Sequence, residues 1–309
     1  MHFLGFKWDN SSCLPFIQYR SVPNKDEVKF YELKIGSPIN ITFKKEKYCI
    51  GHFSNPEYNK VSCKHNIDLK EANSRQCLIC QNSDSALFLP LQTLNEYQRN
   101  IVKSQPHLNY ISVLGKDSIK VGVAAKVRKY TRVCEQGSHA SIFFTECDGI
   151  TAREIEELVS KNFNIKQSIN VSAKINALYD YLSNEKAREK LMEVYYKAES
   201  ILKDRYGNFL LKEPEYSYNV GFYNINNEEK VIYYINNIDN LIGISGKVKS
   251  VIGEILLLAD TQNRLIAFNS KLMLGRIIDI DEQVDSNIIS VGHFKKIVYQ
   301  KVADNLTLF

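Results

Sequence analysis

The stretch from residue 107 to residue 163 constrains the fold most, because strand and helix patterns alternate there with clear turn signals between them. Asn109–Leu114 (NYISVL) is rich in β-branched and aromatic residues, which predicts a strand. Residues 115–117 (GKD) have turn chemistry, and Ile119–Val123 (IKVGV) again has the composition of a strand. The stretch is therefore predicted to open with a β-hairpin.

Two helices and a third strand are predicted after the hairpin. Ala124–Glu135 contains helix-forming residues and carries a basic face. Ala140–Glu146 predicts a strand, and Thr151 with Glu154 has the spacing of a capping box, so a second helix is expected to start near Thr151. The predicted order of elements is ββαβα.

Three side chains of this stretch are candidates for phosphodiester chemistry. Cleavage of a phosphodiester builds negative charge, which an arginine beside a metal-holding carboxylate stabilises, while a tyrosine can orient or deprotonate a water molecule. Tyr110 lies on the first predicted strand, Arg128 on the basic helix and Glu156 on the last helix. Folding of the hairpin against the two helices is expected to bring them together.

The same residues resemble the motifs of the GIY-YIG nuclease superfamily. Tyr110 stands in the first motif strand, Arg128 falls where the motif arginine falls, and Glu156 matches the motif glutamate. Residues 120–122 (KVG) replace the usual second motif, so Lys120 stands where the superfamily has a tyrosine. Lysine binds phosphate well, but at its ordinary pKa it is a poor base. The resemblance implies Mg²⁺ or Mn²⁺ held by Glu156 and covers this stretch only.

A closer resemblance, over most of the chain, is to domain-of-unknown-function family 2797. Members of that family show a similar KVG…R…R…EQGA…AR..E core. Here the core is formed by residues 120–122, Arg128, Arg132, residues 135–138 (EQGS in place of EQGA), and residues 152–153 (AR) with Glu156.

Charge along the central stretch predicts a nucleic-acid partner, either DNA or RNA. The formal charge of the whole chain is only +5, so the local distribution has to decide. Between residues 116 and 132, six basic residues stand against one acidic residue, Asp117. Lys120, Lys126 and Arg132 are the candidate phosphate-binding residues. The alternatives are that the protein binds nucleic acid without cleaving it, or that the run is an ordinary solvated helix face.

Four cysteines upstream predict a structural zinc site. Cys77 and Cys80 form a CxxC pair, which can bind one metal ion from a tight turn, and Cys49 and Cys63 can complete a tetrahedron. His52 and His65 lie close enough in sequence to replace one of the cysteine ligands. Three further cysteines have no partner at metal-ligand spacing and are predicted to be ordinary reduced residues: Cys13, Cys134 and Cys147.

The complete chain is predicted to be an α+β protein with five parts. These are a β-rich segment (1–46), a zinc module with linker (47–105), a GIY-YIG-like domain (106–165), a helical segment (166–208) and a C-terminal β-rich domain (209–309) that forms a small barrel or curled sheet. No apolar run is long enough to cross a membrane, no secretory signal is recognisable and no nucleotide-binding glycine motif occurs. We therefore expect a cytoplasmic protein that has no membrane partner and no nucleotide cofactor.

Overall fold

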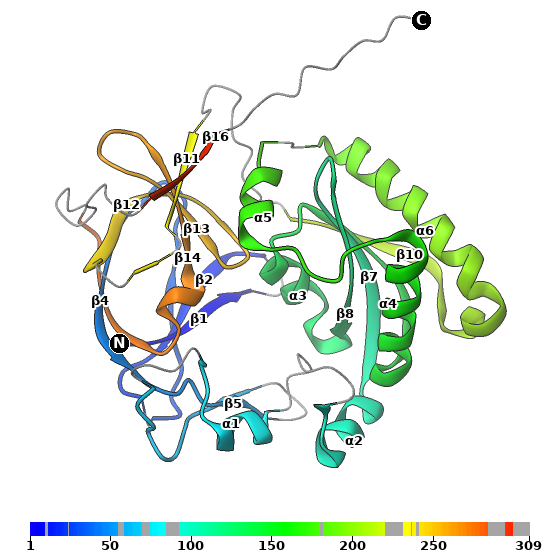
Figure 1. Cartoon of the computed structure of the whole chain (residues 1–309), viewed down its shortest axis with the longest axis horizontal. Coiled ribbons are helices and arrows are strands. Elements are labelled where there is room, and N and C mark those ends of the chain that lie inside the picture. The colour runs from blue at the N-terminus through cyan, green and yellow to red at the C-terminus, as the bar shows by residue number, and fades with distance from the viewer. Residues whose placement is uncertain are drawn as a thin grey trace, which may run out of the picture.

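The structure is a computed structural model with an α+β architecture built on two large sheets. It describes residues 1–9, 12–23, 25–54, 59–69, 74–84, 93–179, 182–219, 231–235, 237–238, 241–283 and 294–298. A ten-stranded sheet and a four-stranded sheet lie on opposite sides of the molecule, with helices α3 (Lys129–Gln136) and α5 (Val171–Ala177) between them (Figure 1).

Strands from both ends of the chain form the ten-stranded sheet. In spatial order it contains β16 (Phe294–Val298), β11 (Val231–Ile235), β14 (Leu265–Asn269), β13 (Ile255–Ala259), β12 (Gly243–Ile252), β4 (Pro38–Lys47), β15 (Arg276–Asp281), β1 (His2–Trp8), β2 (Pro15–Arg20) and β3 (Lys29–Glu32). All neighbours in it are antiparallel except β11 and β14. Strands from both β-rich segments that the sequence predicts, 1–46 and 209–309, thus join in one sheet.

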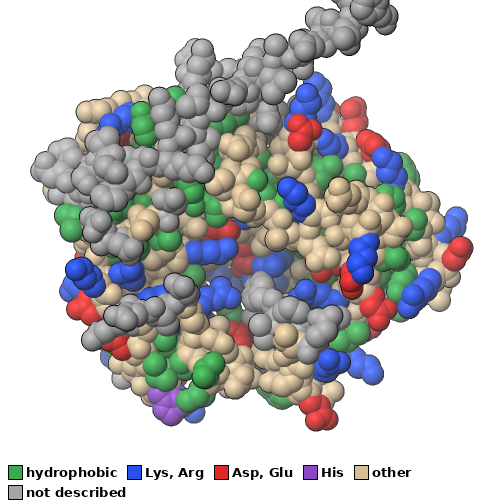
Figure 2. All heavy atoms as spheres, in the orientation of Figure 1, with side chains coloured by type: hydrophobic (Ala, Val, Ile, Leu, Met, Phe, Trp, Pro, Cys, Tyr) green, Lys and Arg blue, Asp and Glu red, His purple; other side chains and the backbone are tan. Residues whose placement is uncertain are grey.

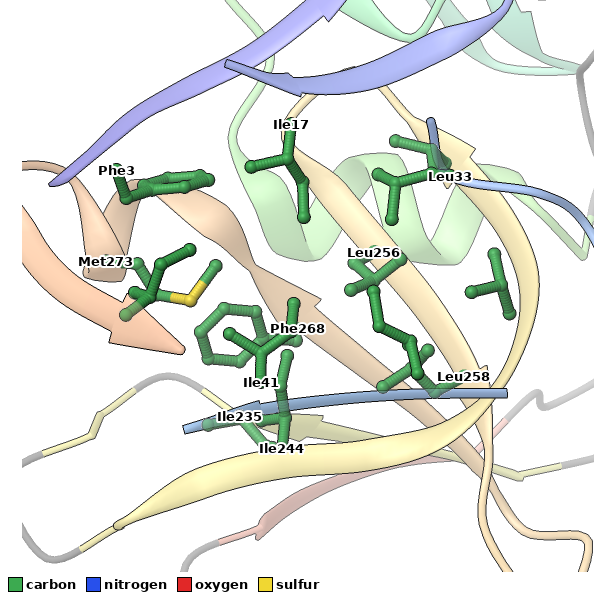
Figure 3. Packing of buried hydrophobic residues seen from close by; sticks show 14 of the residues in the cluster. Phe3, Ile17, Leu33, Ile41, Ile235, Ile244, Leu256, Leu258, Phe268 and Met273 are labelled. Atoms are coloured by element: carbon green, nitrogen blue, oxygen red, sulfur yellow. The ribbon is translucent and has the colours of Figure 1, made fainter. Parts of the chain in front are cut away.

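This sheet curls around its own core without closing. Ile17 on β2 and Ile235 on β11 are far apart in the strand order, yet both belong to one buried cluster with Phe3, Ile41 and Phe268. Figure 3 shows these side chains converging from strands on several sides. The described strands end in an open order at β3 and β16. Of the two expected shapes for the C-terminal region, the small barrel is wrong and the curled sheet is correct.

The four-stranded sheet is antiparallel, in the order β10 (Leu210–Tyr218), β9 (Ala140–Asp148), β7 (Pro106–Gly115) and β8 (Ser118–Ala125). Helices α4 (Gly149–Phe163) and α6 (Asn184–Tyr206) pack their apolar residues on it in one buried cluster (Figure 1). The β7–β8 hairpin is confirmed. The sequence assigns β10 to the C-terminal domain, whereas the structure pairs it with β9.

Both helices of the central stretch begin at positions other than those predicted. Strand β8 continues to Ala125 and a 3₁₀ turn follows at Lys126–Arg128, so α3 starts only at Lys129. Helix α4 starts at Gly149 with Asp148 as its N-cap, and the Asp148 carboxylate accepts hydrogen bonds from the Ile150 and Thr151 amides (2.9 and 3.2 Å). The prediction of a helix start near Thr151 is confirmed, with the start two residues earlier, whereas the capping box predicted at Thr151 is wrong.

The remaining described strands and α-helices belong to residues 47–105, which include the four cysteines. They are strands β5 (His52–Phe53) and β6 (Lys60–Val61), helix α1 (Leu78–Ser83) and helix α2 (Glu96–Ser104). Strand β5 and α1 lie at the lower edge of the molecule in Figure 1, below the ten-stranded sheet. None of the helices that the structure describes is long and apolar enough to pass through a bilayer.

Candidate functional site

A cluster of four cysteine side chains is the first candidate site. The ligand atoms of Cys49, Cys63, Cys77 and Cys80 all lie within 4.8 Å of one another, and all four residues are buried. The Sγ atoms of Cys63 and Cys77 are 3.8 Å apart. Tetrahedral coordination at about 2.3 Å places sulfur atoms about 3.8 Å from each other. The arrangement therefore fits a four-coordinate metal ion.

Local geometry of the chain prepares these sulfur atoms for a metal. Cys77 is the N-cap of α1, and its amide donates a hydrogen bond to Cys49 Sγ at 3.2 Å. Burial raises the pKa of the Cys49 thiol to about 11 in the metal-free protein. A cation would reverse this effect, because it binds the thiolate form. Among the described residues the cluster contains cysteines only, so His52 and His65 are not part of it.

A cleft of about 280 Å³ beside β8 is the second candidate site, and we call it the site cleft. Strand β8 is the outer strand of its sheet, so side chains of the hairpin and of α4 can meet around it. The charged and phenolic side chains that line the cleft are Tyr110, Lys120, Arg128, Arg132, Arg153 and Glu156. The structure thus brings Tyr110, Arg128 and Glu156 to one place, together with Lys120 and Arg132. Lys126 does not line the cleft and pairs with Glu146 at 2.6 Å.

Tyr110 lies across the hairpin with its hydroxyl group in the interior. Its ring packs against Phe143 and faces Gly122, its partner on β8. The hydroxyl oxygen is buried without a hydrogen bond of good geometry, although Arg132 is close enough to act on it electrostatically. Burial raises the pKa of this phenol, so the hydroxyl stays protonated at neutral pH and can donate a hydrogen bond.

Lys120 is a buried lysine whose pKa is lowered. Its side chain is buried on the same face of the hairpin as Tyr110, with Nζ 5.6 Å from the centre of the Tyr110 ring. Nζ donates a hydrogen bond to Gln136 Oε1 at 3.0 Å. Burial, followed by the charge of Arg132, lowers the pKa of Lys120 to about 8. A sizeable fraction of the amine is therefore neutral near pH 8 and able to accept a proton.

Glu135 holds the two arginines of the α3 region in place. Arg128 Nη2 lies 2.7 and 2.8 Å from the two oxygens of the Glu135 carboxylate, and Arg132 Nη1 lies 3.6 Å from Oε2. The Arg128 guanidinium also lies 5.7 Å from the centre of the Phe53 ring. These contacts fix two guanidinium groups before any ligand binds.

Glu156 is the carboxylate of the site cleft. Burial raises its pKa, and the nearby charges of Arg153 and Lys120 act in the opposite direction. Arg153 Nη1 lies 3.7 Å from Glu156 Oε2. Arg153 belongs to the core shared with the resembling family, yet it was not among the predicted site residues. The spacing of three residues on one helix, which places both side chains on the same face, was the signal that could have identified it.

Comparison with known proteins identifies the family of the chain. Neither the curated proteins nor the solved structures contain a match to it. A family model described as "Protein of unknown function (DUF2797)" matches residues 36–276, which is well over half of the chain. This range includes the cysteine cluster, the site cleft and five of the ten strands of the curled sheet: β4, β11, β12, β13 and β14. The chain therefore belongs to the DUF2797 family of proteins of unknown function.

Proposed function

We propose that this protein is a nuclease-like protein that binds nucleic-acid phosphodiesters in the site cleft and hydrolyses them with the help of a divalent metal ion. The observation that carries the proposal is the convergence of a tyrosine, a lysine, three arginines and a glutamate on one cleft. The order of hairpin, basic helix, strand and glutamate-bearing helix supports a relation of residues 106–165 to the GIY-YIG superfamily.

Charge in the site cleft favours a phosphate group as the ligand. Lys120, Arg128, Arg132 and Arg153 line it together with a single carboxylate, Glu156. A phosphodiester brings negative charge to this surplus of cations, and guanidinium groups match the oxygens of phosphate in geometry. Arg128 and Arg132 are held by Glu135, so they bind the phosphate without a large loss of side-chain entropy and stabilise the charge that develops in the transition state.

Glu156, Lys120 and Tyr110 each have a separate role in the proposed hydrolysis. Glu156 would hold Mg²⁺ or Mn²⁺ through its carboxylate oxygens, and such an ion would supply Lewis-acid stabilisation of the phosphate oxygens. Lys120 in its neutral form accepts the proton of the attacking water molecule, which its lowered pKa allows. Tyr110 keeps its proton and orients the water or a phosphate oxygen by donating a hydrogen bond.

Substitution of the carboxylate tests the hydrolytic function. We expect Glu156→Gln to reduce cleavage by at least about 10²-fold, since the metal ligand is lost, while binding stays largely intact. The assay uses single- and double-stranded DNA and RNA with Mg²⁺ or Mn²⁺, beside binding measured at two salt concentrations. Glu157→Gln is the matched control, because Glu157 is an exposed neighbour that pairs with Lys161. Equal activity of the two variants would contradict the proposal.

Binding without turnover is the second candidate function, and the burial of Tyr110 favours it. The Tyr110 side chain has no exposed surface, so water reaches its hydroxyl only if the cleft opens. Salt-dependent binding of nucleic acid, without metal-dependent cleavage of any substrate, would select this function. Neither binding nor cleavage would reject both functions.

We further propose that the cysteine cluster holds a structural zinc ion. Four thiolates in a closed tetrahedral set are typical of structural zinc and leave no open position for catalysis. Elemental analysis of the purified protein is expected to find about one zinc ion per chain. Cys77→Ser should lower the zinc content and the unfolding temperature, because metal binding contributes to folding stability, whereas Cys13→Ser should keep the zinc. A zinc-free parent protein would refute this proposal.

A further inference from the structure

A second and larger cavity of about 810 Å³ adjoins the site cleft, and we call it the basic cavity. Arg128 and Arg132 line both spaces, so the two are neighbours through the start of α3. Figure 2 shows a hollow at the centre of the molecule in which lysine and arginine side chains gather beside a few acidic ones.

Cations reach the basic cavity from every wall. Besides Arg128 and Arg132, the lining contains Lys7 from β1, Lys60 from β6, Arg75 from the segment before α1, and Lys271 from the 3₁₀ turn after β14. The walls thus come from the curled sheet, the cysteine module and α3. Such a distribution is the electrostatic footprint of a groove that follows a polyanion.

Most acidic residues of the lining already have partners in the protein. Glu254 pairs with Lys174 and Lys271 at 3.1 and 2.9 Å. Asp26 accepts a hydrogen bond from the Ser62 amide at 2.8 Å. Six basic side chains face four carboxylates in total. A surplus of positive charge therefore remains inside a partly enclosed space, where it acts more strongly than on an open surface.

Two contacts hold Lys60 at the wall of the basic cavity. Its Nζ donates a hydrogen bond to the Leu4 carbonyl oxygen at 2.7 Å and lies 5.2 Å from the centre of the Phe53 ring. Burial, followed by the neighbouring charges of Arg20 and Arg75, lowers the pKa of this ammonium group to about 7. A phosphate close by would favour the charged form, so binding of an anion and protonation of Lys60 reinforce each other.

Size separates the ligands that the basic cavity admits. Its volume falls within the range of roughly 300–1,000 Å³ in which proteins enclose drug-sized ligands, so a few nucleotides fit and a duplex enclosed by these walls does not. We propose that the basic cavity takes an extended single strand of DNA or RNA whose reacting phosphate lies in the site cleft. This inference rests on the proposed function and adds its substrate class.

Lys7→Gln is the variant that tests this path, because Lys7 is an exposed residue of β1 that lines the basic cavity and not the site cleft. A fluorescently labelled single strand, the matching duplex and a dinucleotide are the probes. We expect the long single strand to bind much more tightly than the dinucleotide and the duplex. Lys7→Gln should weaken binding of the long strand severalfold and reduce the slope of log affinity against log salt by about one, while cleavage of the dinucleotide stays unchanged.

Lys161→Gln is the control, since Lys161 is an exposed residue of α4 that lines neither space. Equal affinity for single strand and duplex, or an unchanged affinity in Lys7→Gln, would overturn the inference. Suppose that one of these contrary results is found but the dinucleotide is still cleaved in a Glu156-dependent manner. The proposed function then stands, and only the substrate path is wrong. If the dinucleotide is not cleaved but the long strand shows the expected Lys7 dependence, the path stands and the hydrolytic function fails.

A pair of cysteines outside the metal cluster carries a second, independent inference. Cys134 on α3 donates a hydrogen bond to Cys13 with the two Sγ atoms 3.1 Å apart, although 121 positions separate them in the sequence. Cys13 lies in the turn between β1 and β2 with a left-handed φ of 53°. The contact joins the curled sheet to the helix that carries Arg132.

The two thiols differ in exposure and in pKa: Cys13 is partly exposed with a lowered pKa, and Cys134 is buried with a raised pKa. Cys13 is partly exposed, and the hydrogen bond from Cys134 lowers the pKa of the Cys13 thiol to about 7. Its thiolate can attack a peroxide, which leaves a sulfenic acid on Cys13 and hydroxide from the peroxide. The Cys134 thiol then attacks Cys13 Sγ, so that the sulfur–sulfur bond forms and water leaves. We propose that Cys13 and Cys134 are an oxidisable pair that cross-links β1–β2 to α3.

Hydrogen peroxide is the probe for this pair. After treatment, peptide mapping under non-reducing conditions is expected to find the Cys13 peptide joined to the Cys134 peptide, and dithiothreitol should separate them. Cys13→Ser should remove the cross-link, whereas Cys147→Ser should retain it, because Cys147 is a buried cysteine elsewhere on β9. Overoxidation of Cys13 without a cross-link, or no reaction of either residue, would contradict the inference.

Discussion

The absence of a side chain at Gly122 makes room for the ring of Tyr110. A Cβ atom at this position would lie 2.5 Å from both Cζ and Oη of Tyr110, closer than such atoms approach in proteins. We therefore expect Gly122→Ala to displace the ring, lower the free energy of unfolding by about 1–3 kcal/mol and reduce nucleic-acid cleavage. Gly207→Ala is the control, because no heavy atom lies within 4 Å of the added carbon. Urea unfolding and the cleavage assay measure both; equal stability of the two variants would show that Tyr110 moves freely.

Lys120 makes stability depend on pH in alkaline solution. The pKa of Lys120 is about 8 in the folded protein and 10.5 as its ordinary value, so between these limits the unfolded chain binds more protons. Stability therefore rises with pH across this window, by up to about 3 kcal/mol from this residue. Lys120→Met removes the titrating group and should flatten the rise. Urea unfolding of both proteins from neutral pH to about pH 10 measures the difference, and parallel curves would exclude a lowered pKa.

Individual residues of the site cleft were predictable where a motif marks them. Tyr110, Arg128 and Glu156 came from their spacing and resemblance, and the structure places them in one cleft. The ion pair between Glu135 and Arg128 and the contact between the Cys13 and Cys134 thiols were not predictable. Both depend on side-chain directions, and the thiol pair also on a contact between distant segments, which local patterns do not contain.

Helix α4 shows how one hydrogen bond decides where an element begins. The sequence offers Thr151 with Glu154 as a capping box, but the Thr151 hydroxyl donates to Asp148 Oδ2 at 2.6 Å. Thr151 thus lies inside the helix, and Asp148 accepts hydrogen bonds from the free amides of Ile150 and Thr151 at its start. Local composition predicted that a helix forms here. It did not predict whether Asp148 or Thr151 caps the helix, because both residue types are good N-caps.

The Asp148 cap carries a prediction at the level of the element. Asp148→Ala leaves the amides of Ile150 and Thr151 without their acceptor, so the free energy of unfolding should fall by about 0.5–2 kcal/mol. Glu154→Ala should cost less, because Glu154 makes no capping contact and instead accepts a hydrogen bond from Tyr206. Thermal unfolding followed by circular dichroism compares the two. A larger loss in Glu154→Ala would mean that the helix begins at Thr151 after all.

The whole molecule depends on pairing between the two ends of the chain. Local patterns predicted strands in residues 1–46 and in residues 209–309, since alternation of apolar residues is a short-range signal. They did not predict that β1 pairs with β15 or that β4 lies between β12 and β15. These pairings depend on turns, bulges and packing across more than two hundred residues, and no single segment encodes them.

Removal of residues 1–35 tests this dependence, because the family match starts only at residue 36. The deleted part contributes Phe3, Trp8 and Ile17 to the core of the curled sheet, and all three are buried. Without each of these side chains the core loses about 1.5–3 kcal/mol of hydrophobic stabilisation. Strand β15 also loses its neighbour β1. We expect a chain that begins at Gly36 to lack cooperative unfolding and near-ultraviolet circular dichroism. A truncated chain with the same unfolding temperature as the full chain would show that the matched region folds without β1–β3.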